Sequence, residues 1–535
     1  MPQERISSQL GPWVEGVAYN QAAEDMEEAA ITTMSNMELG TSGEVKKRLG
    51  TASYKDEDPK SGTPTVTFCG EFTIPPTTTE VVMIAGAVAY RHSGTAWVDQ
   101  TGSSTITAND DYTFVGAVDE AKGVLLLTNG YNPPLSKPAT GVFATAIVGW
   151  DGNDEVGDPE GPVETRFTRA DTVAVYNDRA WWGSTGTDYD RIWYSDIADI
   201  TTIGVSQFYQ LGTPVIALVP MKESLAVHTE SGIHTVTPTG NTKVPFQQEQ
   251  STNIGCVSKR GVAVLPGGVQ QFIRRDGIYS WDGGDVVERI SNALDGDYWP
   301  NLNTVTGTAD RMRHSFALYY PLKDQTWFWL PYGSGQTEMN HIMIWSGAHE
   351  AFFGPYEGGS LFTRNCAGLI AGSPHAGTHD SSGNIGGTVQ DHQPLATYND
   401  DDNTSGGTAI KAYFKTGSPA PEGSATMVRW LYARTYYDAT GKFTVTVEQE
   451  SSGVDGTVKT FSTDGGGFTL DDSLLDAETL GTIRMLSADT DLSGYDPHSS
   501  LKFSNNDLNA YFTIRRTHPV YLAIGQIRKR KAGVG

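Results

Sequence analysis

The feature that most constrains the fold of this chain is a hairpin pattern that recurs at a regular spacing. Six segments share one form: an extended run, a tight polar turn, and a second run rich in Trp, Tyr or Ile. Asn-Gly, Asp-Gly and Ser-Gly pairs at such turns supply the positive φ that primed hairpins require. The turns lie near residues 130, 178, 232, 277, 324 and 374, so the intervals run from 45 to 54 residues.

This spacing predicts a ring of small sheets. One twisted sheet cannot bury both of its faces, whereas a closed ring of sheets can, and several strands per unit at this period are typical of a β-propeller. We therefore expect a six-bladed β-propeller, with five or seven blades left open. A further hairpin with its turn at Ser93-Gly94 either opens the first blade or completes the last. The alternative is that these are ordinary hairpins of a large sandwich.

The composition favours an all-β protein. The 60 glycines and 26 prolines suit many strands and tight turns, and 10% aromatic residues make disorder improbable. One helix is expected, over residues 21–34, where Ala, Glu and Met have high helix propensity. The stretch that follows, residues 34–51, reads as two short strands around a turn at Thr41–Gly43.

Changes in composition and residue pattern along the chain divide it into three parts. Residues 1–75 hold N-terminal strands and the short helix, and 76–404 hold the propeller. The polar, acidic stretch 397–408 reads as a linker. Alternation over Phe443–Val447 is typical of a half-buried strand, so 405–535 is expected to form a β-sandwich or barrel platform module, completed by the N-terminal strands.

The charge argues against a nucleic-acid binder. Binding through phosphates requires a clustered basic surface, whereas this chain carries a formal net charge of −25. An acidic surface repels DNA within a Debye length of about 8 Å. A conduit through which DNA must slide without adhering remains compatible with this charge.

Cysteine usage and hydropathy indicate a protein folded in a reducing cytoplasm. Cys69, Cys256 and Cys366 are far apart and form no C-x-x-C, so we expect buried free thiols rather than a disulfide framework or a zinc ribbon. The N-terminus has no apolar signal-peptide region, and the longest apolar stretch, residues 81–90, is about half of a membrane helix.

Searches for catalytic motifs predict no enzyme. The chain has no G-x-S-x-G pentapeptide, Gly441-Lys442 lacks the preceding P-loop glycine, and His349-Glu350 lacks the second zincin histidine. The sialidase box is also missing, and Asp276-Gly277 and Asp282-Gly283 are better explained as turns. We therefore expect no catalytic residue and no cofactor, although a carboxylate pair for glycosidic cleavage stays open.

Three groups of residues invite a binding role. The densest set of possible metal ligands comprises His375, His379, Asp380, Asp391 and His392, but its spacing fits no named site, so no metal is expected. The aromatic runs are interpreted as core rather than sugar-stacking platforms; they are Trp181-Trp182, Trp193-Tyr194, Trp327-Phe328-Trp329 and Phe352-Phe353. The basic run 528–531 is expected to be a solvated end or to face an acidic partner.

Four stretches resemble the tail nozzle or tail hub proteins of short-tailed, podovirus-type bacteriophages. They are MSNMELGTSGEVKKRLGT, VAVYNDRAWWGSTGTDYDRIWYSDIADITTI, VIALVPMKESLAVHTESGIHTV and TIRRTHPVYLAIGQIRKR. The second is the strongest match, a hairpin followed by a strand that ends in Tyr194-Ser195-Asp196. The resemblance covers most of the chain as a pattern; the acidic loop 151–160 and the long C-terminal module depart from it.

The resemblance implies a structural virion protein. Such subunits form a ring, expected here to be a hexamer, that docks the head-to-tail adaptor, contacts tail fibres and passes viral DNA through its lumen without specific binding. The alternative from another class is a propeller that binds or cleaves glycans for host attachment; carboxylates clustered at one propeller end together with exposed Trp would favour it. A cellular propeller that serves as an interaction scaffold fits the fold but not the four stretches.

Overall fold

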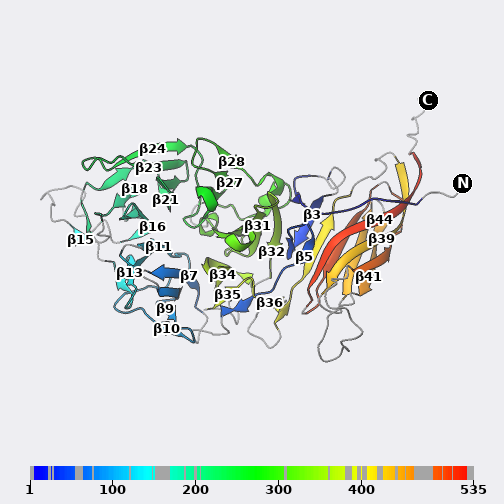
Figure 1. Cartoon of the computed structure of the whole chain (residues 1–535), viewed down its shortest axis with the longest axis horizontal. Helices are drawn as coiled ribbons and strands as arrows, with labels where there is room; N and C mark the ends of the chain where they lie inside the picture. The colour runs from blue at the N-terminus through cyan, green and yellow to red at the C-terminus, as the bar shows by residue number, and fades with distance from the viewer. Residues whose placement is uncertain are drawn as a thin grey trace, which may run out of the picture.

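The described part of the chain is all-β. The computed structural model describes residues 5–526 except 22–25, 27–28, 55–63, 75–77, 120–121, 147–148, 151–168, 186–187, 198–201, 205, 307–309, 359–361, 380–387, 395–398, 401–406, 419–425, 440–443, 452–453, 463–485, 494, 497 and 509. Within these residues only strands and short 3₁₀ turns occur. The chain forms a β-propeller and a β-sandwich beside it (Figure 1).

The propeller consists of seven four-stranded antiparallel sheets. Blade 1 comprises β7 (Val66–Ile74), β8 (Thr78–Ala85), β9 (Val88–His92) and β10 (Trp97–Asp99). Blade 2 comprises β11 (Val115–Asp119), β12 (Val124–Thr128), β13 (Leu135–Pro138) and β14 (Ala144–Thr145). Blade 3 comprises β16 (Ala170–Tyr176), β17 (Arg179–Thr185), β18 (Asp188–Tyr194) and β20 (Phe208–Gln210). Blade 4 comprises β21 (Val215–Pro220), β22 (Leu225–Thr229), β23 (Ile233–Pro238) and β24 (Phe246–Thr252). Blade 5 comprises β25 (Val262–Val264), β26 (Gln270–Arg274), β27 (Gly277–Trp281) and β28 (Val287–Arg289). Blade 6 comprises β29 (Phe316–Tyr320), β30 (Gln325–Leu330), β31 (His341–Ser346) and β32 (Ala351–Tyr356). Blade 7 comprises β33 (Arg364–Ile370), β34 (Ser373–Thr378), β35 (Val389–Asp391) and β6 (Ala52–Ser53).

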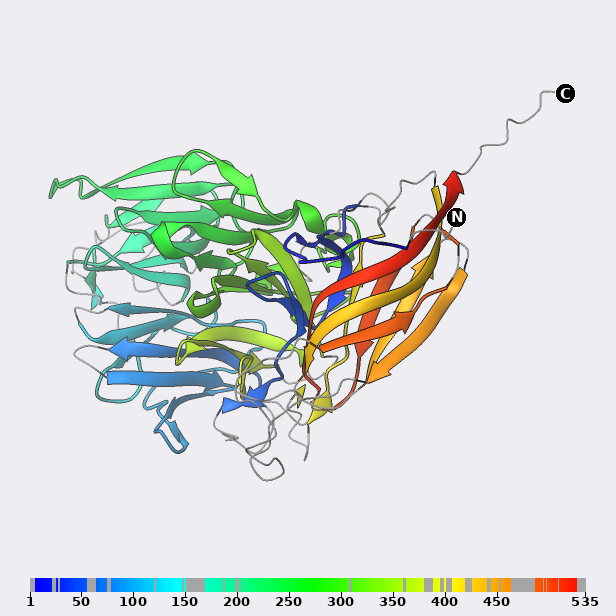
Figure 2. The same ribbon diagram turned by 45° about the vertical axis from the view of Figure 1, so that its right-hand side comes forward.

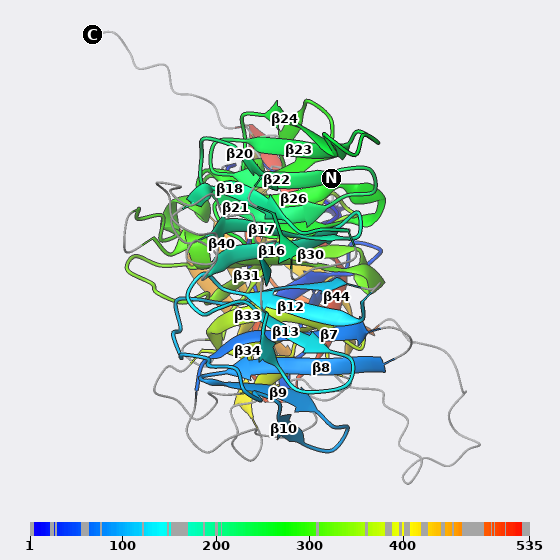
Figure 3. The same ribbon diagram turned by 90° about the vertical axis from the view of Figure 1, so that its left-hand side faces the viewer.

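Apolar side chains hold neighbouring blades together. Separate buried clusters join blades 1 and 2, 2 and 3, 3 and 4, 4 and 5, and 7 and 1. The Trp181-Trp182 pair illustrates why strand alternation does this: Trp181 packs toward blade 4 and Trp182 toward blade 2. Seen from the side away from the sandwich, the strands of blades 1 to 4 run across the view one blade above another (Figure 3).

The ring is closed by strands from both ends of the propeller segment. The inner strand β33 of blade 7 lies against the inner strand β7 of blade 1, so closely that a Cβ on Gly368 would lie 2.3 Å from the Cys69 carbonyl oxygen. The outer strand of blade 7 is β6, which precedes blade 1 in the chain and pairs with β35 through Ser53↔Gln390 and Ala52↔Asp391. We call this blade 7–blade 1 boundary the seam.

The propeller has seven blades and not the expected six, because the recurring turns do not lie at equivalent places within their blades. Asn177-Asp178 joins the first two strands of its blade, whereas Asn129-Gly130 joins the second and third strands. The hairpin at Ser93-Gly94 belongs to a blade of its own, blade 1. The turn expected near Pro374 lies at Ala371-Gly372, where both residues have positive φ.

The second module is a sandwich of two six-stranded sheets (Figure 2). One sheet comprises β1 (Ile6–Ser7), β4 (Met37–Leu39), β5 (Val45–Lys47), β39 (Thr426–Ala439), β42 (Leu486–Asp491) and β44 (Phe512–Gln526). The other comprises β2 (Gly16–Val17), β3 (Ala30–Ser35), β38 (Ala412–Thr416), β40 (Thr444–Ser451), β41 (Val454–Ser462) and β43 (Ser500–Asn505). Each sheet thus combines N-terminal and C-terminal strands, and Tyr437 of one packs on Phe461 of the other at 5.2 Å between ring centroids.

Three details differ from the sequence-based expectations. The helix expected over 21–34 is wrong for its last part, since residues 30–35 form β3 between β2 and β38, and tertiary pairing overrides local propensity. The propeller begins before residue 76, because β7 is the inner strand of blade 1. The segments AYFTIRRTH (510–518) and VYLAIGQIRK (520–529) read as two strands in the sequence, but residues 512–526 form one strand, β44. The two short strands around the Thr41–Gly43 turn are confirmed as β4 and β5.

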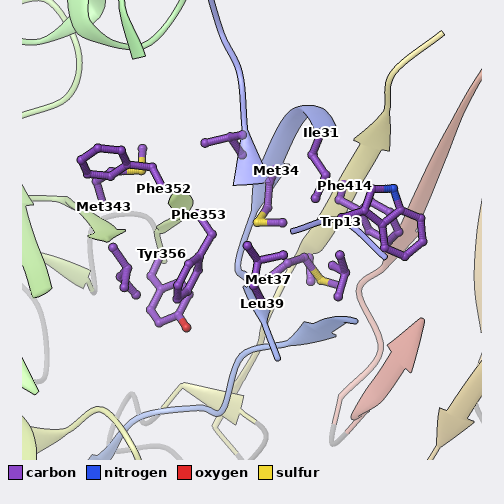
Figure 4. Packing of buried hydrophobic residues seen from close by; sticks show 14 of the residues in the cluster. Trp13, Ile31, Met34, Met37, Leu39, Met343, Phe352, Phe353, Tyr356 and Phe414 are labelled. Carbon is purple, nitrogen blue, oxygen red and sulfur yellow. The ribbon is translucent and has the colours of Figure 1, made fainter. Parts of the chain in front are cut away.

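One apolar core runs from the sandwich into blades 5 and 6. Figure 4 shows the part of this core where the sandwich meets blade 6. On the sandwich side, Trp13 packs edge-on against Phe414 at 5.1 Å between ring centroids. On the propeller side, Phe353 of β32 is fully buried, and the backbone N–H of Gly354 donates to Met34 Sδ at 3.4 Å. The two modules therefore share a continuous interior.

Candidate functional site

The contact between propeller and sandwich is built around Arg48, whose side chain is 1% exposed. Its guanidinium donates to both carboxylate oxygens of Asp400, at 2.8 and 2.6 Å, and to Asn36 Oδ1 at 2.7 Å. The same group lies over the ring of Phe362, 4.9 Å from its centroid. Residues 48 and 400 lie on the two chain segments that connect the modules, so this pair fastens both connections together.

Glu38 of β4 forms the second polar anchor of this contact. It lies 3.0 Å from Lys46 Nζ and 3.2 Å from Lys323 Nζ of blade 6, and it accepts a hydrogen bond from the Tyr356 hydroxyl at 3.0 Å. Burial acts to raise the pKa of Glu38, but the ammonium groups of Lys323 and Lys46 outweigh it and hold the pKa below its ordinary value. We call Asn36, Glu38, Lys46, Arg48, Lys323, Tyr356 and Asp400 the junction.

The basic triplet Lys46-Lys47-Arg48 shows how the sequence specifies the junction. Successive side chains of an extended segment point to opposite sides. Lys46 and Arg48 reach the junction carboxylates, whereas Lys47 is fully buried in the sandwich and donates to Asn505 Oδ1 at 2.9 Å. Burial lowers the pKa of Lys47 to about 8.

A second candidate site lies at the end of the propeller channel where the inner strands begin. Two neighbouring cavities of ≈380 and ≈310 Å³ share residues of this channel mouth. The first is lined by Asp110, Glu338 and His379 among others, and the second by Asp171 and Lys259. Carboxylates from several blades thus gather at one end of the propeller.

Side chains cross the channel at this mouth. Lys259, which precedes blade 5, donates to the backbone oxygen of Asn129 in blade 2 at 2.7 Å. Arg311, which precedes blade 6, forms an ion pair with Asp111, which precedes blade 2, at 2.7 Å. These contacts bridge opposite sides of the ring, so the channel mouth is braced rather than open.

Several charged groups near the mouth are paired with one another. Asp310 is almost fully buried and accepts from Arg275, at 2.9 Å to its Oδ1, and from Arg313 Nε, also at 2.9 Å. Burial lowers the pKa of His314 to about 4, and the nearby cations Arg311 and Arg260 act in the same direction. The arrangement is a set of ion pairs around a neutral imidazole.

The histidine-rich segment does not assemble a metal site among the described residues. His375 and His392 are buried, and His392 packs against Trp327 and accepts from the Arg364 guanidinium at 3.3 Å. His379 lies apart from them, 4.0 Å from Glu338, and Asp391 lies 4.0 Å from His375. Asp380 lies outside the described residues, as do the acidic loop 151–160 and the basic run 528–531.

The aromatic runs are core residues, as predicted. Their eight Trp, Tyr and Phe side chains other than Tyr194 are at most 1% exposed, and Tyr194 is 6% exposed. No tryptophan whose side chain the structure describes is exposed. Asp276 and Asp282 lie at turns, as expected. No described helix has the length and apolarity needed to span a membrane.

The junction and the channel mouth were not found from the sequence. Arg48 and Asp400 are separated by 352 positions, and nothing in either segment indicates the other. The one sequence signal for the junction was the triplet Lys46-Lys47-Arg48 within a hairpin. If one face of a strand is buried, three consecutive basic residues place at least one charged side chain on that face, where it requires a polar partner.

Comparisons with known proteins give structural likeness only. No family model and no curated protein matches the chain. A structure of PorZ, a bacterial surface component of the type-IX secretion system of Porphyromonas gingivalis, is 13% identical over 70% of this chain, with a TM-score of 0.37; this chain spans 44% of PorZ. YCF48, solved bound to a D1 peptide, is 9% identical over 67% of this chain and 97% of its own, with a TM-score of 0.39. BBS1N, solved in complex with ARL6DN, is 11% identical over 65% of this chain and 95% of its own, with a TM-score of 0.30.

Proposed function

We propose that this chain is a structural subunit of the tail of a short-tailed bacteriophage. It is a nozzle or hub protein, and six copies form a ring that docks the head-to-tail adaptor, carries tail fibres and passes the genome. The proposal begins from the four stretches that resemble this family. The observation that carries it is the buried Arg48–Asp400 pair, which joins both connections between propeller and sandwich.

A rigid two-module body suits a load-bearing ring. A single connection between modules acts as a hinge, whereas two parallel connections held by one buried ion pair resist bending. The shared apolar core adds to this coupling. Force applied to the sandwich, the module proposed to dock the adaptor, would therefore pass to the propeller without relative movement.

The braced channel mouth supports a DNA path through the proposed ring of copies. Lys259 and Arg311 each make a contact across the propeller channel, so DNA would pass between copies and not through a propeller. A net charge of −25 per chain would keep such a lumen from adhering to DNA.

The second candidate function is glycan binding or cleavage for host attachment. The carboxylates Asp110, Asp111 and Glu338 beside a cavity of ≈380 Å³ favour it. Against it, Asp111 is paired with Arg311, and the described tryptophans offer no exposed stacking surface.

Negative-stain imaging of the purified protein, alone and mixed with the adaptor of its particle, separates these functions. The nozzle proposal predicts closed rings, alone or on the adaptor. Monomers in both samples, together with saturable binding of host surface polysaccharide that is lost in Glu338→Gln, would replace it with the attachment function.

A further inference from the structure

Two of the three cysteines face each other across the seam. Cys69 lies on β7 of blade 1 and Cys366 on β33 of blade 7, and their sulfur atoms are 3.7 Å apart. They are 297 positions apart in the chain and both are free thiols. Two cysteines therefore meet at the boundary where the first and last blades touch.

The two sulfur atoms already lie close to the separation of a disulfide. A disulfide requires about 2.05 Å between sulfur atoms, so side-chain rotation must close a gap of less than 2 Å. Gly377 of β34 packs directly on Cys366, where a Cβ would lie only 2.6 Å from the sulfur. The Cys366 sulfur and the Val66 side chain together fill the place where that Cβ would lie. Cys69 lies 3.9 Å from the His375 carbonyl oxygen, which is a contact weak enough to break.

The seam is the place where a covalent link has the largest structural effect. Between other neighbouring blades the chain links two complete four-stranded sheets. At the seam it links blade 1 only to the two-residue strand β6, which blade 7 holds by its pairing with β35. An aromatic cluster covers this boundary, with Tyr54 beside His92 and His375 at 5.1 and 5.4 Å between ring centroids. A bond between Cys69 and Cys366 would fix blade 1 to blade 7.

We propose that Cys69 and Cys366 are a disulfide-forming site that covalently closes the propeller when the protein meets a low-molecular-weight disulfide oxidant. One thiolate attacks a sulfur of oxidised glutathione and releases one glutathione thiolate, which leaves a mixed disulfide on the protein. The second protein thiolate then attacks the protein sulfur of that mixed disulfide and releases the second glutathione. Both protein thiols lose their protons, the protein is oxidised by two electrons, and the glutathione disulfide is reduced to two thiols.

Cys366 is suited to be the attacking group. The hydrogen-bonding contact with Cys366 raises the pKa of Cys69, and burial acts in the same direction. Burial also acts to raise the pKa of Cys366, but the contact with Cys69 and the Arg260 guanidinium outweigh it and lower that pKa. Because both thiols are buried, the oxidant reaches them when the seam opens transiently. The inference depends on the closure of the ring and not on the proposed role in a virus particle.

Mass spectrometry after incubation with oxidised glutathione tests the site. Protein purified under reductant is incubated at 25 °C and, in parallel, just below its melting temperature, where the seam opens more often, and is then alkylated and digested. The expected result is a cross-linked peptide pair that contains residues 69 and 366, with Cys256 alkylated only after unfolding. Free thiols at both positions in both samples would overturn the proposal.

The thermal consequence provides a second readout. The oxidised protein should melt several degrees higher than the reduced protein, and dithiothreitol should reverse the increase. Cys366→Ser should abolish both the cross-link and the shift, whereas the matched control Cys256→Ser, at the equally buried cysteine near Ser258, should retain them. A cross-link that forms without raising the melting temperature would contradict the claim that it closes the ring.

Discussion

Arg48 and Asp400 are joined by two parallel hydrogen bonds of 2.8 and 2.6 Å, although 352 positions separate them in the chain. Their segments also form a short parallel bridge, Thr51↔Asp400. The chain thus leaves the sandwich and returns to it at one place, and a single buried ion pair fastens both passages.

Breaking this pair should destabilise the protein strongly. In Arg48→Met the Asp400 carboxylate is left buried without its partner, and we expect a loss of about 3–5 kcal/mol in the free energy of unfolding. Urea denaturation measures the loss. The matched control is Arg434→Met, since Arg434 makes an equally bidentate pair with Asp489, both bonds 2.7 Å, on an exposed surface. That change should cost less than about 1 kcal/mol, and equal losses in the two variants would contradict the role of burial.

Gly50 should tolerate no side chain. A Cβ there would lie 1.9 Å from the Asn399 carbonyl oxygen, and this neighbour is backbone that cannot rotate away. Gly50→Ala should therefore separate the two connecting segments and lower the free energy of unfolding by about 3 kcal/mol. Gly284→Ala is the control, because its nearest neighbour is the flexible Asp282 side chain at 3.2 Å, and it should stay within about 0.5 kcal/mol of the parent.

The all-β class, the hairpins and the aromatic core could be predicted because they depend on neighbours in sequence. Asn177-Asp178 shows this well: a polar pair between two apolar runs predicted a tight turn, and both residues have the positive φ of a primed hairpin, 52° and 57°. The seam and the junction could not be predicted, because β6 pairs with β35 across 337 positions at Ser53 and Gln390. Two residues of strand are too short to carry a pattern. β44 likewise continues through Pro519, although the segments on either side of it read as separate strands.

The turn at Asn177-Asp178 gives a local test of blade 3. Asp178→Gly should leave stability unchanged or raise it slightly, because glycine adopts positive φ without strain. Asp178→Val should lower the free energy of unfolding by about 1–2 kcal/mol, because a β-branched side chain clashes in the left-handed region. Thermal denaturation of both variants checks the order, and a stable valine variant together with an unstable glycine variant would contradict the turn assignment.

His228 should make the propeller sensitive to acid. It is fully buried, its Nε2 lies 2.6 Å from Gln270 Oε1 of the next blade, and burial lowers its pKa to about 4. A group whose pKa is depressed on folding contributes stability above its unfolded pKa of about 6.5 and loses it as the pH falls toward 4. The loss should reach about 3 kcal/mol across this window.

Chemical denaturation of the parent and of His228→Gln at pH 7.5 and pH 4 isolates this contribution. Glutamine cannot titrate, so the variant should lose about 3 kcal/mol less than the parent between the two pH values. An identical loss in both proteins would show that His228 does not couple proton binding to folding.

Native mass spectrometry of the purified protein bound to its adaptor tests the central claim most directly. The nozzle account predicts an assembly that contains six copies of the 57.7 kDa chain. A single 57.7 kDa chain, with the adaptor unbound at every concentration, would contradict it.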